Sequence, residues 1–123
     1  MSLDRREIEK IENLEHCTHL ACLYLSENLI QSIGAAFTGH SFKMLESLSL
    51  DDNHIHKIEG LEVLVHLKKL DLEKNCISRL EGLHNCRALE ELYLSKQILP
   101  DFVEFTFDEE RTMPALAVRI MNE

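Results

Sequence analysis

The chain has 123 residues, which is enough for one domain with a continuous apolar core. Its 22 acidic and 13 basic residues give a formal net charge of −9, so it lacks the basic footprint of a direct nucleic-acid binder or of a polybasic membrane anchor. No apolar run approaches the ~20 residues of a membrane-spanning helix, and the charged stretch MSLDRREIEK has no signal-peptide core. We therefore expect a cytoplasmic protein that contacts neither nucleic acid nor membrane directly.

The first predicted element is a half repeat over residues 1–19, in which Ile8, Ile11 and Leu14 match the apolar spacing of later segments. Four repeats follow over residues 20–99. Each reads leucine, two residues, leucine, one residue, leucine, two residues and then asparagine, or glutamine in the last repeat. The repeats start at Leu20, Leu45, Leu67 and Leu89, so the interval is 22 residues from 45 to 67 and from 67 to 89, and 25 residues from 20 to 45. A fixed period with this pattern is typical of a leucine-rich repeat.

Each repeat is predicted to form a short strand, a turn at the asparagine and a returning segment. Leucines in L-x-L alternation share one face of a strand. The turn is buried between neighbouring coils, where backbone groups need partners, and an asparagine amide offers both a donor and an acceptor. We therefore predict a structural ladder of Asn28, Asn53 and Asn75, with returning segments such as residues 59–65 as short helices or 3₁₀ turns. The predicted fold class is an α/β leucine-rich repeat solenoid with parallel strands on the concave face and helices or 3₁₀ turns on the convex face.

Residues 100–123 are predicted to close the stack with an acidic segment and a capping helix. Phe102 and Phe105 lie 22 residues after Leu80 and Leu83, so they keep the phase of the repeat. Thr112 followed by a proline indicates a helix start. The apolar face of that helix is formed by Met113, Leu116, Ala117, Ile120 and Met121. Another repeat could begin after this helix, so we expect residues 1–123 to be a single domain and a fragment of a longer protein.

The positions between the strand leucines are predicted to point outward from the concave face. They form columns across the strands, and two tyrosines stand at opposite ends of one column with carboxylates between them. Tyrosine is favoured at interfaces because it combines apolar area with a polar group. We predict a docking surface for a basic or mixed-charge protein segment; a generic solvated face is the alternative. The predicted partner-binding residues are Tyr24, Ser49, Asp51, Asp71, Glu73 and Tyr93.

The cysteines and histidines do not show metal or disulfide spacing. Cys17 and Cys86 share one repeat position in the predicted core, where a reduced thiol behaves as a small apolar group, whereas Cys22 lies on a strand. His54 and His56 are expected to be solvated loop residues. The sequence has no glycine-rich phosphate loop and no Ser/His/Asp arrangement. We therefore expect a non-catalytic protein without metal or cofactor.

The segments IENLEHCTHLACLYLSENLIQSI, LDDNHIHKIEGLEVLVHLKKL and LEKNCISRLEGLHNCRALEEL resemble the 22-residue class of leucine-rich repeat. That class is found in regulatory subunits of protein phosphatase 1 and in many ciliary and axonemal proteins. The segment LYLSKQILPDFVEFTFDEERTMPALAVRI is similar to the testis-type regulatory subunits of this phosphatase. The matching residues are Gln97, Leu99, Pro100, Phe107, Asp108, Leu116 and Ala117, whereas Lys96 and Ile98 depart from the pattern.

This resemblance implies a scaffold whose partner is the catalytic subunit of protein phosphatase 1 or a tubulin-based structure. The corresponding location is the cytoplasm, the cytoskeleton or a cilium. The alternative is a component of a ribonucleoprotein that acts through a protein partner, since similar repeats hold a nucleic-acid-binding protein there.

Overall fold

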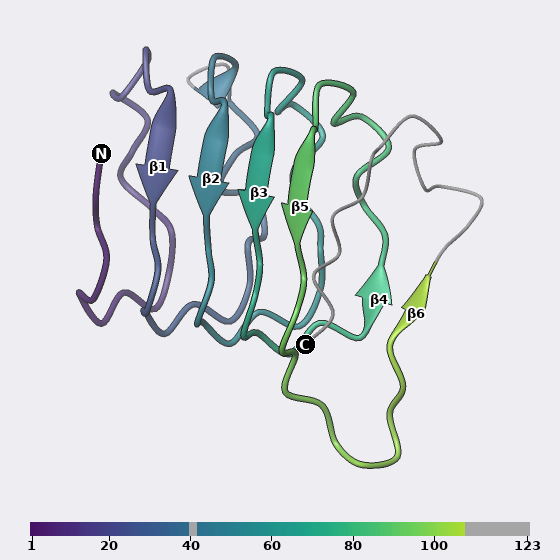
Figure 1. The fold of residues 1–123 in the computed structure, drawn as a ribbon. Helices are drawn as coiled ribbons and strands as arrows, with labels where there is room; N and C mark the ends of the chain where they lie inside the picture. The colour runs from purple at the N-terminus through teal and green to yellow at the C-terminus, as the bar shows by residue number, and fades with distance from the viewer. Residues whose placement is uncertain (40–41, 108–123) are drawn as a thin grey trace.

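The structure is a computed structural model that describes residues 1–39 and 42–107 (Figure 1). Four short strands lie side by side in one parallel sheet: β1 (Cys22–Tyr24), β2 (Ser47–Ser49), β3 (Lys69–Asp71) and β5 (Glu91–Tyr93). Two more, β4 (Arg79–Leu80) and β6 (Thr106–Phe107), form a separate parallel pair. Successive coils of the chain are thus stacked, and the predicted sheet of short parallel strands is confirmed.

The strand register follows the sequence repeat. Leu23, Leu48, Leu70 and Leu92 are aligned across the four strands, and each is 0% exposed. Burial of one such side chain stabilises the fold by about 1.5–3 kcal/mol. The alternate side chains point away from this core because successive residues of a strand face opposite sides. The outward side chains of residues 22–26, 47–51, 69–73 and 91–95 form the strand face.

The returning side of the described coils is built from isolated turns, so of the predicted short helices or 3₁₀ turns the helices are not found there. Apart from a 3₁₀ residue at Phe42, the described residues contain no helical element, and residues 59–65 form turns. Single bonds of the i→i+3 type close these turns, for example from Leu64 N to Leu61 O at 3.1 Å. A segment this short cannot offset the entropic cost of nucleating a helix, so the 22-residue coil returns through isolated turns.

Two glycines allow the later coils to approach closely on the returning side. Gly60 and Gly82 both have φ of +73°, in the region that favours glycine. A Cβ on Gly60 would lie 2.1 Å from the carbonyl oxygen of Gly34, and one on Gly82 would lie 2.3 Å from that of Ile58. Backbone from successive coils is therefore in direct contact at these two positions.

The three extra residues of the first repeat are accommodated by an aromatic pair. Phe37 is 0% exposed and Phe42 is 3% exposed. Their rings meet edge to face with 5.0 Å between centroids, an arrangement that aromatic quadrupoles favour. The longer first repeat thus packs its insertion into the core.

The N-terminal half repeat begins as an additional partial coil beside β1. Leu3 N donates to Tyr24 O at 2.7 Å, and Arg5 N donates to Ser26 O at 3.0 Å. These bonds repeat the pattern between later coils, where Leu25 N donates to Ser49 O. Residues 1–8 therefore cover one edge of the sheet (Figure 1).

The C-terminal part departs from the predicted phase. Phe102 keeps the sequence phase of the buried Leu80, yet its side chain is 88% exposed. Leu80 instead pairs with Phe107 through β4 and β6, which is 27 residues later (107 − 80) rather than 22. The connection between these two paired strands is therefore five residues longer than the repeat interval, and Phe105, unlike Phe102, packs partly against the core. The predicted helix over residues 112–121 lies outside the described residues.

Candidate protein-docking surface

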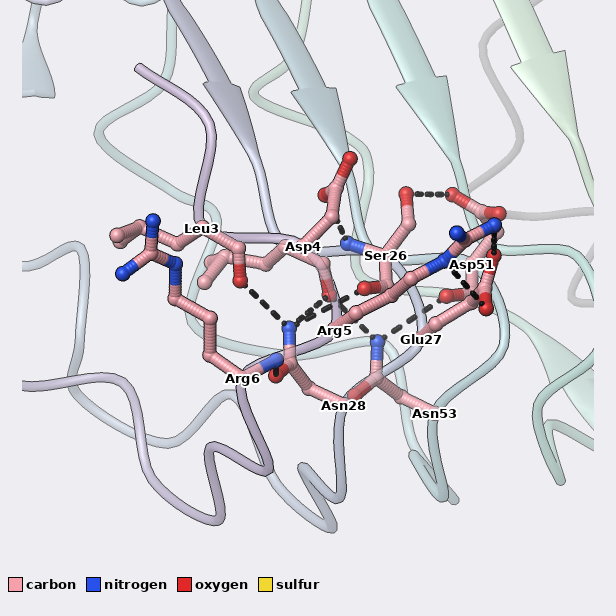
Figure 2. A network of polar contacts seen from close by, with 10 residues as sticks. Leu3, Asp4, Arg5, Arg6, Ser26, Glu27, Asn28, Asp51 and Asn53 are labelled. Carbon is pink, nitrogen blue, oxygen red and sulfur yellow. Dashed lines mark hydrogen bonds and ion pairs between the residues drawn. The ribbon is translucent and has the colours of Figure 1, made fainter.

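The ladder residues occupy the same point of successive coils. Asn28, Asn53 and Asn75 are 4%, 3% and 0% exposed. The Asn53 amide donates to Leu25 O and Leu50 O, both at 3.0 Å, and its oxygen accepts from Ile30 N at 3.1 Å. Each asparagine side chain therefore bonds to its own coil and to the preceding one (Figure 2). These side chains lie inside the stack, where they position the strand face and cannot touch a partner.

The ladder extends one coil beyond the asparagines at each end. Gln97 takes the fourth position, where its amide donates to Leu72 O at 2.8 Å and its oxygen accepts from Ile77 N at 2.9 Å. At the other end the Asn28 oxygen accepts from Arg6 N and Ile8 N, at 2.9 and 3.0 Å. Glutamine thus performs the same bonding as asparagine at the half-buried end of the stack.

A rim of charged side chains precedes the ladder positions. The rim residues all have φ between 54° and 61° and are Arg5, Glu27, Asp52, Lys74 and Lys96. Non-glycine residues adopt this left-handed conformation at a cost of roughly 1–2 kcal/mol each. The Arg5 guanidinium forms two hydrogen bonds with the Glu27 carboxylate, at 2.9 and 3.0 Å (Figure 2). The opposite end of the rim carries positive charge from Lys74 and Lys96.

The predicted partner-binding residues lie together on the strand face. Register pairs Tyr24 with Ser49, Ser49 with Asp71, and Asp71 with Tyr93, so they form one row across the sheet. Neighbouring strands are about 4.8 Å apart. The structure therefore places the two tyrosines at the ends of this row, on β1 and β5, with Asp71 nearer to Tyr93.

Three carboxylates form the centre of the strand face. Asp71 Oδ1 accepts from Glu73 N at 3.1 Å. Ser26 Oγ donates to Asp51 Oδ1 at 2.5 Å, and Ser95 Oγ donates to Glu73. The ion pairs among residues 1–39 and 42–107, Arg5–Glu27 and Lys68–Glu46, include none of these three carboxylates. Neutral hydroxyl and amide donors therefore hold negative charge that no lysine or arginine of that part neutralises by direct contact.

Asp71 carries the electrostatic cost of this arrangement. Desolvation by partial burial, with smaller contributions from the nearby charges of Asp51 and Glu73, raises its pKa from the ordinary 3.8 to about 6. The backbone bond from Glu73 and the charge of Lys69 oppose the shift without cancelling it. A cation brought to this point would relieve the repulsion.

The two tyrosines have different surroundings. Tyr24 is 38% exposed, and interaction with the neighbouring Cys22 side chain is the main cause that raises its pKa. The Tyr93 hydroxyl donates to Glu91 at 3.1 Å, while the Lys69 ammonium lies 5.6 Å from the Tyr93 ring centroid. The repeat pattern alone did not reveal this cation–π contact. The pattern does place Lys69 and Glu91 side by side, at the first residue of neighbouring strands β3 and β5.

The cysteines divide by position in the stack. Cys86 is 0% exposed, as expected for the core, and burial raises its pKa to about 11, with a smaller effect from Glu62. Cys17, predicted in the core at the same repeat position, is only half-buried. Cys17 lies in the half repeat, at the edge of the described stack of coils, whereas Cys86 donates to Leu61 O of the preceding coil. Cys22 is also partly exposed.

In the described part of the chain, no group of three or more His, Cys, Asp or Glu side chains is arranged to hold a metal ion. Within residues 1–39 and 42–107 no helix is long and apolar enough to cross a membrane.

The stacked parallel strands, buried leucines and amide ladder define the class as a solenoid of short repeats. Residues 43–83 match the family described as Leucine Rich repeats (2 copies), so this stretch is a leucine-rich repeat segment. It includes β2, β3 and β4 and two of the three ladder asparagines. A search of curated proteins found no match to the chain. The family match identifies the repeat and does not extend to the phosphatase regulatory subunits.

Proposed function

We propose that this protein is a non-catalytic scaffold that docks a protein partner on its strand face. Leucine-rich repeats typically bind proteins on the extended surface that their stacked units create. The observation that carries the proposal is the trio Asp51, Asp71 and Glu73, which adjacent coils bring together without a neutralising ion pair. A buried-leucine core beneath these residues keeps their spacing fixed.

The proposed partner segment is basic or of mixed charge. Its lysines or arginines would lie over the three carboxylates, where they lower the repulsion that acts on Asp71. Tyr24 and Tyr93 would provide apolar contact at the two ends of the row. An acidic side chain of the partner would suit the positive rim at Lys74 and Lys96.

The resemblance to phosphatase regulatory subunits suggests the catalytic subunit of protein phosphatase 1 as partner, or a tubulin-based structure. The protein would then act in the cytoplasm, at the cytoskeleton or in a cilium. The second candidate is a ribonucleoprotein component that acts through a protein partner. The net charge of −9 favours such an indirect role over direct contact with RNA phosphates.

The test replaces the three carboxylates together by Asp51→Lys, Asp71→Lys and Glu73→Lys. Exposed ion pairs contribute about 0.2–1 kcal/mol each, so single changes have small effects and the triple change abolishes binding. Pull-downs with the purified phosphatase catalytic subunit and with microtubules measure this, and circular dichroism verifies folding. If the charge reversal unfolds the chain, the isosteric variant with Asp51→Asn, Asp71→Asn and Glu73→Gln is used instead. It removes the three charges without changing side-chain size and should also weaken binding.

The matched control reverses three exposed carboxylates elsewhere, Glu62→Lys, Asp101→Lys and Glu104→Lys. It has the same net charge and should retain binding. Undiminished binding by a folded strand-face variant, or loss of binding only in the control, would overturn the proposal and move the site toward the acidic segment that begins at Asp101. Affinity purification of the full-length protein from its native cell, followed by mass spectrometry, distinguishes the candidate partners.

A further inference from the structure

A half-open cavity of about 720 Å³ lies on the returning side of the first two coils. Its walls come from residues 9–15 of the half repeat and from residues 29–39 with Phe42 of the first repeat. None of the six partner-binding residues of the strand face lines it. The cavity is therefore a separate surface that the proposed docking on the strands does not use.

The irregular spacing of the first repeat explains why the cavity opens at this place. In the later coils, Gly60 and Gly82 bring backbone against backbone, and an added Cβ would meet a neighbouring carbonyl oxygen at 2.1 or 2.3 Å. A Cβ on Gly34 would meet only Ser32 Oγ, at 3.6 Å. At Gly34 the first repeat thus makes no close backbone contact with the preceding coil, although Leu29 N still donates to Ile8 O at 2.8 Å.

The cavity combines an apolar floor with an acidic rim. Ile11, Ile33 and Phe42 are buried at 7%, 2% and 3% exposure, whereas Leu29 is 41% exposed. Concave sites with a mostly apolar lining and a few polar groups are typical of binding sites. The charged residues that line the cavity are Glu9, Glu12, Glu15 and Lys10, so their formal charges sum to −2.

We infer that this cavity binds a short protein segment in which aliphatic side chains are flanked by basic ones. The apolar floor accepts the aliphatic side chains, because burying them removes apolar area from water. Glu9 and Glu12 favour lysine or arginine beside them by charge complementarity. A second copy of this chain is a poorer occupant because both copies carry a net charge of −9. The segment would belong to a protein bound at the same time as the strand-face partner or to a distant part of that partner.

The probe is an acetylated and amidated peptide of the sequence KLLKK, titrated into the ¹⁵N-labelled full chain and followed by NMR. We expect saturable shifts at the amides of Leu29 and Ala35. Two comparison peptides replace either the leucines by serine or the lysines by glutamate. Both should bind at least about tenfold more weakly, the loss expected when one buried aliphatic contact or the charge complementarity is removed.

Two substitutions at exposed positions test the cavity without touching the core. Leu29→Asp places a charge at the exposed leucine, and Ala35→Trp fills the space between the walls; each should abolish peptide shifts. Val65→Asp, at a side chain that is 39% exposed on another coil, is the matched control and should leave binding unchanged. Equal binding of the serine peptide, or unchanged binding to both cavity variants, overturns the inference.

The isosteric strand-face variant separates this inference from the proposed function. Retention of KLLKK binding by that variant supports a site in the cavity, whatever happens to the strand-face partner. Loss of KLLKK binding in the same variant, together with peptide-induced shifts at Tyr24 or Tyr93 in the wild-type chain, would place the peptide on the strand face and refute the cavity site.

Discussion

Removing one rung of the ladder should reveal how much the stack depends on it. Asn53→Ala deletes one acceptor and three donor contacts, the latter to the carbonyl oxygens of Leu25, Leu50 and Asp51. Those carbonyls keep other partners, since Asn28 bonds Leu25 O, Asn75 bonds Leu50 O and Glu27 N bonds Asp51 O. The Ile30 amide hydrogen has no such replacement and would be left unpaired inside the core.

The magnitude follows from this difference. An unpaired buried amide costs about 1–3 kcal/mol, and each lost secondary bond about 0.5–1.5 kcal/mol. With one unpaired amide and three lost donor bonds, Asn53→Ala should therefore lower the free energy of unfolding by about 2.5–7.5 kcal/mol, toward the lower value because each carbonyl keeps another partner. Gln97→Ala should cost less, since its half-buried position lets water reach the Ile77 amide. Urea denaturation of both variants measures the two costs.

Coupling between rungs provides a sharper check. Leu50 O accepts from both Asn53 and Asn75, at 3.0 Å each. The double variant Asn53→Ala with Asn75→Ala therefore removes both bonds to that buried carbonyl. The double variant should therefore lose more stability than the sum of the two single variants. Equal unfolding midpoints for Asn53→Ala and Gln97→Ala, or strict additivity of Asn53→Ala and Asn75→Ala, would show that the amide ladder does not stabilise the stack in this way.

Three further predictions concern other positions. The raised pKa of Asp71 means that the folded state binds more protons than the unfolded state between about pH 4 and 6. Stability from this group is therefore highest below pH 4 and is lost as pH rises through 6. At pH 7, Asp71→Asn should raise the free energy of unfolding by about 1 kcal/mol relative to wild type, after allowance for solvent screening. A stability difference between variant and wild type that is no larger at pH 7 than at pH 4.5 would contradict this. Gly82→Ala should cost more than about 1 kcal/mol, since φ is positive and a carbonyl oxygen lies 2.3 Å from the new Cβ, whereas Gly39→Ala meets nothing within 4 Å and should be nearly neutral in thermal unfolding. Cys86 should react with a thiol reagent much more slowly than Cys22, because it is buried and its pKa is raised to about 11; equal rates would disprove the core placement.

The sequence alone determined the repeating part of this protein. Every strand of the main sheet has a leucine at its centre, at positions set by the repeat interval, and each asparagine follows the second strand leucine at a fixed distance. Such a pattern is readable because each coil contacts only its neighbours, so one local rule applies along the whole stack. The outward direction of Tyr24, Asp71 and Tyr93 follows from the same alternation.

The tertiary structure decided what the repeat does not constrain. Phe102 fits the sequence phase, yet it is exposed because the chain leaves the stack and pairs β6 with β4 five residues later. Cys17 and Cys86 share a repeat position but differ in burial, since Cys86 packs against the preceding coil, where its thiol donates to Leu61 O, whereas Cys17 lies in the half repeat. The raised pKa of Asp71 and the cavity beside Leu29 likewise arise from neighbours on other coils. The burial and the pKa of a side chain depend on all atoms within a few ångströms. Periodic spacing in the sequence specifies only which residues of the adjacent coil align with it.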